Sequence, residues 1–363
     1  MNSSGNKIYK GMKKMKIAIL TFHWATNYGA VLQAYALQQY LTMEGNEVKI
    51  INYYPSKYKK NYINAFKTKH IKTIYKRLLD VKKEQYFDTF RKKHLNLTEY
   101  FDTCTKLHTI SRKYDCYICG SDQVWNPSFL QYGEKSNTCV YFLDFVNENK
   151  IIASYAGSFG VTEYPDKFHE LIKKHLQRFN FISVRENSGK NIINNLDISE
   201  VSIVPDPTLL LNYDAYMPFV NKSKHSNKYI CTYMLHNQKI KSSKKLYSML
   251  VDKNMDIIEN NNCSIEDWLS NIQNSEIVVT NSFHGIVFSV LFKKNFIALP
   301  IKGSGMNDRL YTLLNKLGLQ DRIYDSDRFD IDAPIDWDNV YAHLNEYRNE
   351  GYKYIKNILD YKK

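Results

Sequence analysis

The sequence predicts an α/β protein built from two Rossmann-like domains in series, and three observations support this fold class. Apolar runs of strand length alternate with stretches of helix length along most of the chain. The chain has 363 residues, a length that favours two domains of ordinary size over one. The segment Pro205-Asp-Pro-Thr208 contains two prolines, which cannot continue a central strand. We therefore expect an N-terminal domain over residues 16–210 and a C-terminal domain over residues 211–363, after a flexible lead-in at residues 1–15.

The N-terminal domain begins with a predicted βαβ unit. The apolar run Lys16–Phe22 has the length of a buried strand, Ala30–Glu44 has the pattern of a helix that stops at Gly45, and Val48–Tyr54 is a second strand. The crossover of such a unit is right-handed by strong preference. Further strands are predicted at four apolar runs, Tyr114–Cys119, Ile151–Tyr155, Phe181–Val184 and Val201–Val204.

The C-terminal domain is expected to repeat this plan. Strands are predicted at Tyr229–Leu235, Met255–Glu259, Glu276–Thr280 and Phe296–Leu299. Helices are predicted at 240–252, Ser264–Asn274, Phe283–Phe292 and Asn307–Leu317, with an amphipathic terminal helix at Trp337–Tyr361. Ser264 followed by two acidic residues is a typical helix start.

Positive charge is concentrated in one segment of the chain. The whole sequence carries 50 Lys and Arg against 37 Asp and Glu, a net charge of +13, and residues 57–113 alone hold 16 of the former and 5 of the latter. The spacing of Ile71, Ile74 and Leu78 predicts that this segment is a basic helical insertion in the first domain. It either faces an anionic partner, such as a lipid headgroup, or reflects a sequence rich in Lys, Asn, Ile and Tyr.

The composition excludes several classes of protein. A hydrophobic fraction of 44% is too high for a disordered chain. The run Ile286–Phe292 is much shorter than the roughly 20 residues of a membrane-spanning helix, and Ile17–Phe22 is too short for the core of a signal peptide. Six cysteines are too few for a disulfide scaffold, so we expect a reduced, cytoplasmic protein. Cys116 and Cys119 form a single CxxC on a strand, where the two side chains point to opposite faces, so no metal site is expected.

Polar or glycine-containing segments follow five of the predicted strands. Open α/β sheets bind ligands at the carboxyl ends of their strands, so we expect these segments to line one cleft. Each could instead be an ordinary turn. The five segments are His23–Gly29, Gly120–Asn126, Ala156–Gly160, Arg185–Gly189 and Asn281–Gly285.

The first two segments suggest an anion site and a sugar site. Asn27, Tyr28 and Gly29 lead into the first helix, whose free backbone N–H groups can face an anion, although a tight turn explains Gly29 equally well. The second segment combines an aromatic ring with groups that pair with sugar hydroxyls, unless its tryptophan is a core residue and its aspartate caps a helix. Its candidate residues are Ser121, Asp122, Gln123, Trp125 and Asn126.

Two further residues are candidates for catalysis. Arg185 ends a predicted strand, where its guanidinium can bind a carboxylate or phosphate, with an ion pair to Glu186 as the alternative. His284 lies at the start of a predicted buried helix, where phosphate binds well and where an imidazole can donate a proton to an anionic substrate. The alternative for His284 is a hydrogen-bonded core histidine.

Taken together, five motifs resemble those of the polysaccharide pyruvyl transferase family. The resemblance extends roughly from Lys16 to Leu319. The motifs, in chain order, are Asn27-Tyr-Gly-Ala-Val-Leu-Gln-Ala-Tyr-Ala36, Gly120-Ser-Asp-Gln-Val-Trp-Asn-Pro127, Ile182-Ser-Val-Arg-Glu-Asn-Ser-Gly189, Asp206-Pro-Thr-Leu-Leu210 and Asn281-Ser-Phe-His-Gly285. The resemblance implies a glycosyltransferase-B-like pair of domains with the active site between them. It also implies transfer of the enolpyruvyl group of phosphoenolpyruvate to two hydroxyls of a sugar, giving a pyruvate ketal and phosphate.

The resemblance also implies roles for individual residues. His284 matches the proton-donating histidine of the family and Arg185 an arginine that binds the donor anion. Many members carry an arginine two residues before that histidine, where this chain has Ser282, and we expect Arg309 to substitute for it. The expected donor-binding residues are then Asn27, Tyr28, Gly29, Ser282, Gly285 and Arg309, with no metal and no cofactor besides phosphoenolpyruvate as donor substrate.

The expected acceptor is a sugar of a surface polysaccharide precursor, such as one linked to a lipid diphosphate, with residues 57–113 facing the inner membrane surface. Two alternatives remain open. One is a nucleotide-sugar-dependent glycosyltransferase of the same architecture, since fold alone does not fix function. The other is a non-catalytic protein that binds an anionic polymer, based on the charge and 29 tyrosines. No nucleic-acid partner is expected under the leading hypothesis, and the sequence predicts no oligomeric state.

Overall fold

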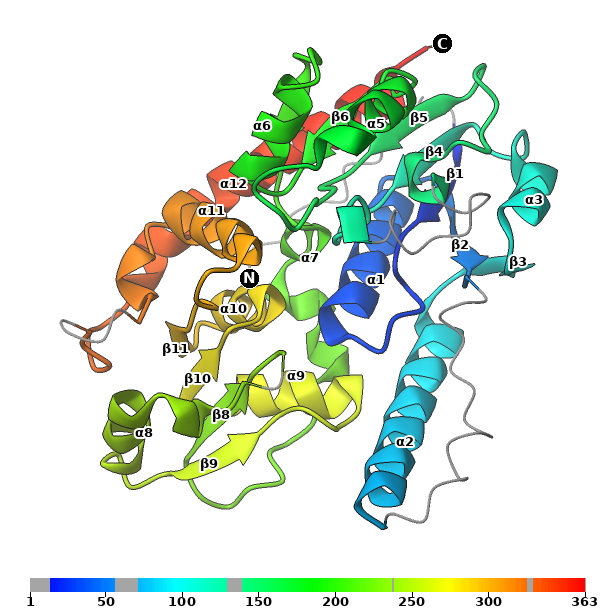
Figure 1. Ribbon diagram of the computed structural model, residues 1–363. Coiled ribbons are helices and arrows are strands. Elements are labelled where there is room, and N and C mark those ends of the chain that lie inside the picture. Colours follow the sequence, from blue (N-terminus) through cyan, green and yellow to red (C-terminus); the bar gives the residue numbers. More distant parts are fainter. Residues whose placement is uncertain (1–13, 56–70, 129–138, 237, 325–328, 363) are drawn as a thin grey trace, which may run out of the picture.

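The computed structural model describes residues 14–55, 71–128, 139–236, 238–324 and 329–362, which form two α/β lobes (Figure 1). In the N-terminal lobe a parallel sheet has the strand order β3-β2-β1-β4-β5. Its strands are β1 (Lys16–Leu20), β2 (Glu47–Tyr53), β3 (Leu97–Phe101), β4 (Cys116–Cys119) and β5 (Ile151–Ser154). The strands β6 (Ile182–Val184) and β7 (Val201–Ile203) pair with each other, and isolated bridges attach β6 to the chain beside β5. The central strands are apolar on both faces because helices cover both sides of the sheet.

Helices connect these strands. The first, α1 (Tyr28–Met43), begins where the Asn27 side chain accepts a hydrogen bond from the Ala30 N–H, and Gly45 follows its end at a φ of +87°. The others are α2 (Ile71–His94), α3 (Cys104–Leu107), α5 (His169–Leu176), α6 (Asn187–Asn194) and α7 (Pro207–Leu210). Sequence analysis missed α5 and α6.

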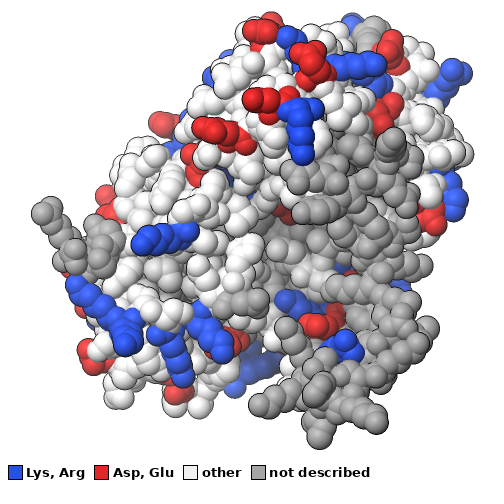
Figure 2. All heavy atoms as spheres, viewed as in Figure 1, with Lys and Arg blue, Asp and Glu red and all other residues white. Residues whose placement is uncertain are grey.

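The basic segment differs from the predicted helical insertion. Its described part contains α2, which connects β2 to β3, and β3 itself is an edge strand parallel to β2. The strand was missed because Glu99 and Tyr100 are exposed, so its apolar pattern is weak. Lys and Arg are interspersed with Asp and Glu over the described residues of the face in Figure 2. Residues 57–70 of the segment lie outside the described residues.

The C-terminal lobe contains a second parallel sheet with the order β11-β10-β8-β9. Its strands are β8 (Tyr229–Tyr233), β9 (Asp256–Glu259), β10 (Ile277–Thr280) and β11 (Asn295–Ala298). Its helices are α8 (Lys244–Val251), α9 (Ile265–Gln273), α10 (Phe283–Leu291), α11 (Asp308–Leu317) and α12 (Trp337–Asp360). The predicted architecture of two Rossmann-like units in series is confirmed.

The last helix returns to the N-terminal lobe. The Tyr354 hydroxyl donates to the Ser154 carbonyl at 2.8 Å, and Ile355 and Ile358 pack with the strands of the first sheet. Gly351 permits this approach, because a Cβ at that position would lie 2.6 Å from the Tyr155 hydroxyl. The C-terminal end of α12 therefore packs on the N-terminal lobe, although the sequence predicts that residues 211–363 belong to the C-terminal domain.

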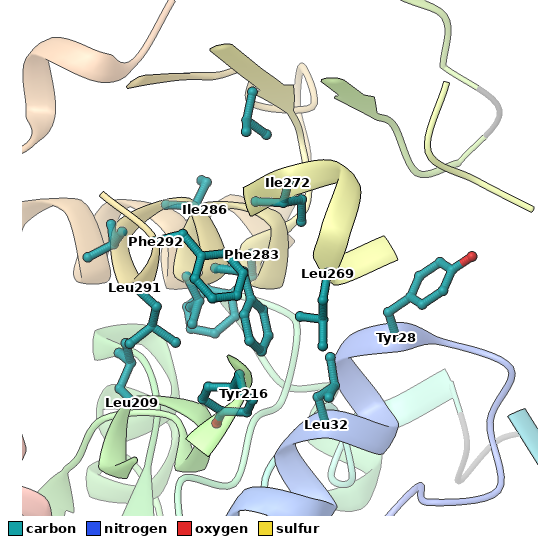
Figure 3. Close-up of a cluster of buried hydrophobic side chains, with 14 of the residues drawn as sticks. Tyr28, Leu32, Leu209, Tyr216, Leu269, Ile272, Phe283, Ile286, Leu291 and Phe292 are labelled. Carbon is teal, nitrogen blue, oxygen red and sulfur yellow. The ribbon is translucent and has the colours of Figure 1, made fainter. Parts of the chain in front are cut away.

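One hydrophobic core joins the two lobes (Figure 3). Tyr28 and Leu32 of α1 lie beside Leu269 of α9 and the side chains of α10, and all belong to one buried cluster. The Tyr28 ring stacks on Trp268 with ring centroids 4.9 Å apart and planes 8° from parallel. Burial of this many apolar side chains favours a fixed relation between the lobes on the α1 side.

Two expectations from composition can be compared with the structure. No helix among the described residues is both long and apolar enough to cross a bilayer. Cys116 and Cys119 are buried on opposite faces of the first sheet, as the strand geometry predicts, and burial raises the pKa of both thiols well above its usual range.

Candidate active site

Side chains from both lobes meet at a buried carboxylate, Asp206, which lies between β7 and α7. Its Oδ2 accepts hydrogen bonds from Arg185 Nη1 at 2.8 Å and Ser121 Oγ at 2.9 Å. Its Oδ1 accepts from the N–H of Thr208 at 3.0 Å and the hydroxyl of Thr208 at 2.6 Å. Burial by itself raises the pKa of Asp206, but His284, Arg185 and Thr208 outweigh burial and hold the pKa well below its usual range.

His284 reaches this carboxylate from the C-terminal lobe. The turn from β10 into α10 positions it: the Ser282 hydroxyl accepts a hydrogen bond from the Gly285 N–H, and a Cβ on Gly285 would lie 2.5 Å from Thr280 Oγ1. His284 Nε2 is 3.5 Å from Asp206 Oδ2, an ion-pair distance that is too long and poorly aligned for a hydrogen bond. The His284 side chain is only 9% exposed.

The other side of the imidazole lies against Gly29. A Cβ added to Gly29 would be 1.9 Å from His284 Nδ1, so only glycine allows the two lobes to approach this closely. The loop that follows β1 and the loop that follows β10 therefore meet at His284.

Arg185 is buried at the centre of the site. Its Nη2 is 3.8 Å from Asp122 Oδ1, its Nε is 3.8 Å from Glu186 Oε2, and its Cζ lies 4.6 Å from the centre of the Phe283 ring. Burial lowers its pKa, but the carboxylates of Asp206, Glu186 and Asp122 outweigh burial and raise the pKa above its usual value. The guanidinium therefore stays charged, and its Nε and Nη2 have no hydrogen-bond partner among the described residues.

Arg309, in the first turn of α11, adds a second guanidinium to the site. Burial and the Arg185 charge lower its pKa to about 10, and the nearby carboxylates only partly oppose this shift. The Gln123 amide, with its oxygen toward the guanidinium, accepts from Nη1 at 2.7 Å and Nη2 at 3.2 Å. Arg309 Nε has no hydrogen-bond partner among the described side chains and backbone. Two guanidiniums and an imidazole thus gather near Asp206, and each has a nitrogen without a hydrogen-bond partner among the described residues.

Three carboxylates balance these positive groups. Asp206 has four hydrogen bonds, Asp122 faces Arg185 and holds a left-handed φ of +87°, and Glu186 is 2% exposed. Glu186 Oε1 accepts from the Phe159 N–H at 3.1 Å, and burial raises its pKa. Among the described residues, no three His, Cys, Asp or Glu side chains gather as metal ligands would.

Trp125 does not line the site, and its predicted role in sugar binding is wrong. The indole is fully buried, stacks on Phe142 with ring centroids 5.6 Å apart, and donates to the Tyr141 carbonyl at 3.1 Å. A ring covered on its faces cannot stack on a sugar, so the alternative of a core residue is correct. Asn126 contacts the Gln123 amide at 2.9 Å and so supports the side chain that holds Arg309.

We call Asp206, Glu186, Arg185, Arg309 and His284, with Asp122, the charged cluster. Other predicted acceptor residues belong to this cluster or contact it. Ser121 donates to Asp206, and Asp122 lies near Arg185 rather than capping a helix. Gln123 contacts Arg309, as described above. This segment therefore holds the guanidiniums in place.

The predicted donor residues divide into two groups. Tyr28 is buried, and its hydroxyl donates to the carbonyls of Cys263 at 2.9 Å and Asn261 at 3.2 Å, so it joins the lobes instead of facing a ligand. Asn27 caps α1, and Ser282 caps α10. Gly29, Gly285 and Arg309 lie at the cluster or shape the turn that carries His284.

Sequence analysis did not assign Asp206 and Glu186 to the site. Asp206 begins one of the quoted motifs and follows the predicted strand Val201–Val204, which is the available signal. Its partners are distant in sequence: Arg185 is 21 residues away and Ser121 is 85 residues away. Proximity of that kind is visible only in the fold.

The chain is similar to known proteins at two levels. Residues 27–303, more than half of the chain, match the family model described as polysaccharide pyruvyl transferase. UDP-N-acetylglucosamine 2-epimerase from Rickettsia bellii has a similar structure, with a TM-score of 0.51, 12% identity and 97% coverage of each chain. A glycosyltransferase from Rickettsia africae is similar with a TM-score of 0.46, 12% identity and 96% coverage of each chain. Comparison with curated proteins gave no match.

Proposed function

Because the chain belongs to the polysaccharide pyruvyl transferase family and has a glycosyltransferase-B-like fold, we propose that it transfers the enolpyruvyl group of phosphoenolpyruvate to two hydroxyls of one sugar. The products are a cyclic pyruvate ketal and inorganic phosphate. The observation that carries the proposal is the cluster in which His284, Arg185 and Arg309 surround Asp206 with unpaired N–H groups. These groups suit a small substrate that carries both a carboxylate and a phosphate.

The first step is protonation of the methylene carbon of phosphoenolpyruvate by His284. Protonation moves the electron pair of the C=C bond to the new C–H bond and leaves an oxocarbenium-like centre at C2. A sugar hydroxyl attacks C2, and its proton returns to the imidazole. A general acid positioned in this way typically contributes about 10²–10⁴-fold to the rate.

The second step closes the ketal. A second hydroxyl of the same sugar attacks C2, the bond from C2 to the phosphate oxygen breaks, and phosphate leaves with the bonding electrons and the hydroxyl proton. Arg185 and Arg309 bind the carboxylate and phosphate through both steps, so their charge stabilises the leaving group. Asp206 acts as a positioning residue, because its carboxylate lies 3.5 Å from His284 Nε2 and accepts a hydrogen bond from Arg185.

Replacement of His284 tests this proposal. We expect His284→Ala to lower kcat by about 10²–10⁴-fold while phosphoenolpyruvate still binds, because the guanidiniums remain. The measurements are phosphate release and mass-spectrometric detection of the ketal, using phosphoenolpyruvate and a set of p-nitrophenyl glycosides as acceptors. Calorimetric titration with phosphoenolpyruvate measures binding separately.

Two controls accompany this experiment: a variant of a core residue and an incubation with a different donor. Trp125→Phe changes a predicted site residue that the structure places in the core, so its kcat should stay near that of the unmodified enzyme. Incubation with UDP-sugars tests the nucleotide-sugar alternative, and release of UDP with transfer of the sugar would contradict our proposal. Equal turnover by His284→Ala would contradict the role of the imidazole.

Contact of residues 57–113 with a membrane, a lipid-linked acceptor and a cytoplasmic location stay predictions.

A further inference from the structure

A separate cavity of about 410 Å³ lies between the lobes. It is formed at the carboxyl ends of β8 and β9 of the C-terminal lobe, and Leu79, Asp80 and Lys83 of α2 form its opposite wall. This volume is within the usual range of small-molecule sites, about 300–1,000 Å³. The cavity is therefore large enough for a saccharide.

Two residues close in sequence to the His284 contact, Asn281 and Asn27, lie at the cavity wall. On one side, the Asn281 side chain accepts from the Leu235 N–H at 2.7 Å and donates to Gln238 Oε1 at 2.9 Å, and both partners line the cavity. Asn281 is three residues before His284. On the other side Asn27 lines the cavity, two residues before the Gly29 that touches the imidazole. The cavity wall is thus continuous with the loop before Gly29 and is hydrogen-bonded to the loop that carries His284.

The lining differs in chemistry from the charged cluster. Among the described residues it contains no arginine and offers the side-chain amides of Asn27, Gln238, Asn261 and Asn262, together with the carboxylates of Asp80 and Glu259, whose charges offset those of Lys83 and Lys239. Amides and carboxylates are the groups that pair with sugar hydroxyls, whereas guanidiniums suit anions. Met234 and Leu235 add apolar surface of the kind that the C–H face of a sugar ring contacts. Asn261 Oδ1 is buried and has no hydrogen-bond partner among the described atoms.

We propose that this cavity binds the sugar acceptor, with the reacting hydroxyls directed past Asn27 and Asn281 toward phosphoenolpyruvate at His284. The inference rests on the proposed function and deepens it, because it places the neutral substrate in the amide-lined cavity and the anionic substrate at the guanidiniums. It also replaces the predicted acceptor site at Ser121–Asn126.

A variant that fills the cavity tests the proposal. Asn262 is exposed and lines the cavity, so Asn262→Trp should fold and occupy the space that a sugar ring would use. We expect its KM for p-nitrophenyl glycosides to rise at least about tenfold, the loss of roughly one good contact, while calorimetric binding of phosphoenolpyruvate changes less than about twofold. Asn339→Trp, at an exposed asparagine of α12 away from the cavity, is the matched control and should keep both values. Gln238→Ala provides a second variant that removes a contact without adding bulk.

A measurement of glycoside binding without phosphoenolpyruvate tests the cavity assignment independently of the transfer reaction. Saturation-transfer NMR with the same glycosides and no phosphoenolpyruvate should show contact with the unmodified protein and with Asn339→Trp, and lose it with Asn262→Trp. If glycosides bind in this pattern but no ketal or phosphate forms, the proposed function fails and the cavity assignment stands. If ketal forms and Asn262→Trp and Gln238→Ala keep the acceptor KM, the cavity assignment alone is wrong. Absence of glycoside binding to the unmodified protein also overturns it.

Discussion

The charged cluster and the neighbouring cavity differ in how deeply their polar side chains are buried and in how firmly hydrogen bonds hold them. In the cluster, Asp206 has four hydrogen bonds and fixes Arg185, with both side chains almost fully buried. In the cavity, Asn262 is exposed and Gln238 and Asn261 are half-buried. Charged groups that stabilise a transition state work best when they are already oriented, since reorientation costs free energy during the reaction. If the cavity binds a neutral sugar, as we propose, its side chains need only pair with hydroxyls.

Removal of the central carboxylate should produce the largest effect. Asp206→Ala leaves the buried Arg185 without its closest partner, and breaking a buried ion pair in this way costs about 3–5 kcal/mol. We expect a loss of this size in the free energy of unfolding measured with urea, together with loss of turnover. Asp122→Asn is the control, because Asp122 is 3.8 Å from Arg185 and more exposed and asparagine tolerates its φ of +87°, so its loss should be smaller. Equal losses for the two variants would show that Asp206 is not the centre of the cluster.

Because Asp206 is ionised in the folded protein, the free energy of unfolding should depend on pH in the acid range. The folded chain lowers the pKa of this carboxyl, so its stabilisation is complete above the pKa of about 3.9 that aspartate has in unfolded chains. The stabilisation is lost progressively as the pH falls below that value. Asp206→Asn carries no titrating group there, so its free energy of unfolding should fall less between about pH 4 and pH 2 than that of the unmodified protein.

A methyl group at Gly29 should have the next largest effect on activity. It acts on the contact between Gly29 and the imidazole of His284. Its Cβ would overlap His284 Nδ1, so the imidazole or the loop must move. A misplacement near 1 Å can cost on the order of 10²-fold in rate, so we expect kcat of Gly29→Ala to fall by about that factor. Binding of phosphoenolpyruvate by calorimetry should change much less, because Arg185 and Arg309 are untouched.

The control for Gly29 is a glycine with open space around it. A Cβ on Gly45 meets no atom within 4 Å, and its φ of +87° is one that asparagine tolerates, so Gly45→Asn should leave kcat unchanged. A normal rate for Gly29→Ala would mean that His284 does not need its present position.

The sequence predicts the framework of this site better than its details. Strands such as Ile17–Leu20 and Ile277–Thr280 are predictable because both faces are buried and every residue but Thr280 is apolar, whereas β3 mixes exposed and buried residues at an edge. Arg185 and His284 are predictable as candidates because each follows the carboxyl end of a strand, β6 and β10, which is where open α/β sheets bind ligands. Trp125 is wrongly predicted because an aromatic ring beside polar residues is typical of both a sugar site and a core. Asp206 depends on partners that are distant in sequence, and the cavity depends on contacts between lobes; no local pattern encodes either.

The smallest effect is expected at Lys83, which connects the basic helix α2 to the cavity wall. Its Nζ donates to the Asn261 carbonyl at 2.7 Å and lies 4.8 Å from the centre of the Tyr28 ring. Lys83→Met keeps the apolar stem and removes this tie, so the loop that carries Asn261 and Asn262 is held less firmly. We expect the KM for p-nitrophenyl glycosides to rise about two- to fivefold with kcat unchanged, since a partly exposed hydrogen bond of this kind contributes on the order of 1 kcal/mol. Lys82→Met removes the same charge one residue earlier on α2, from an exposed position, and should leave the acceptor KM unchanged. If both variants raise KM equally, the charge of α2 acts on the acceptor through its general field; if only Lys83→Met does, α2 acts as a wall of the acceptor cavity.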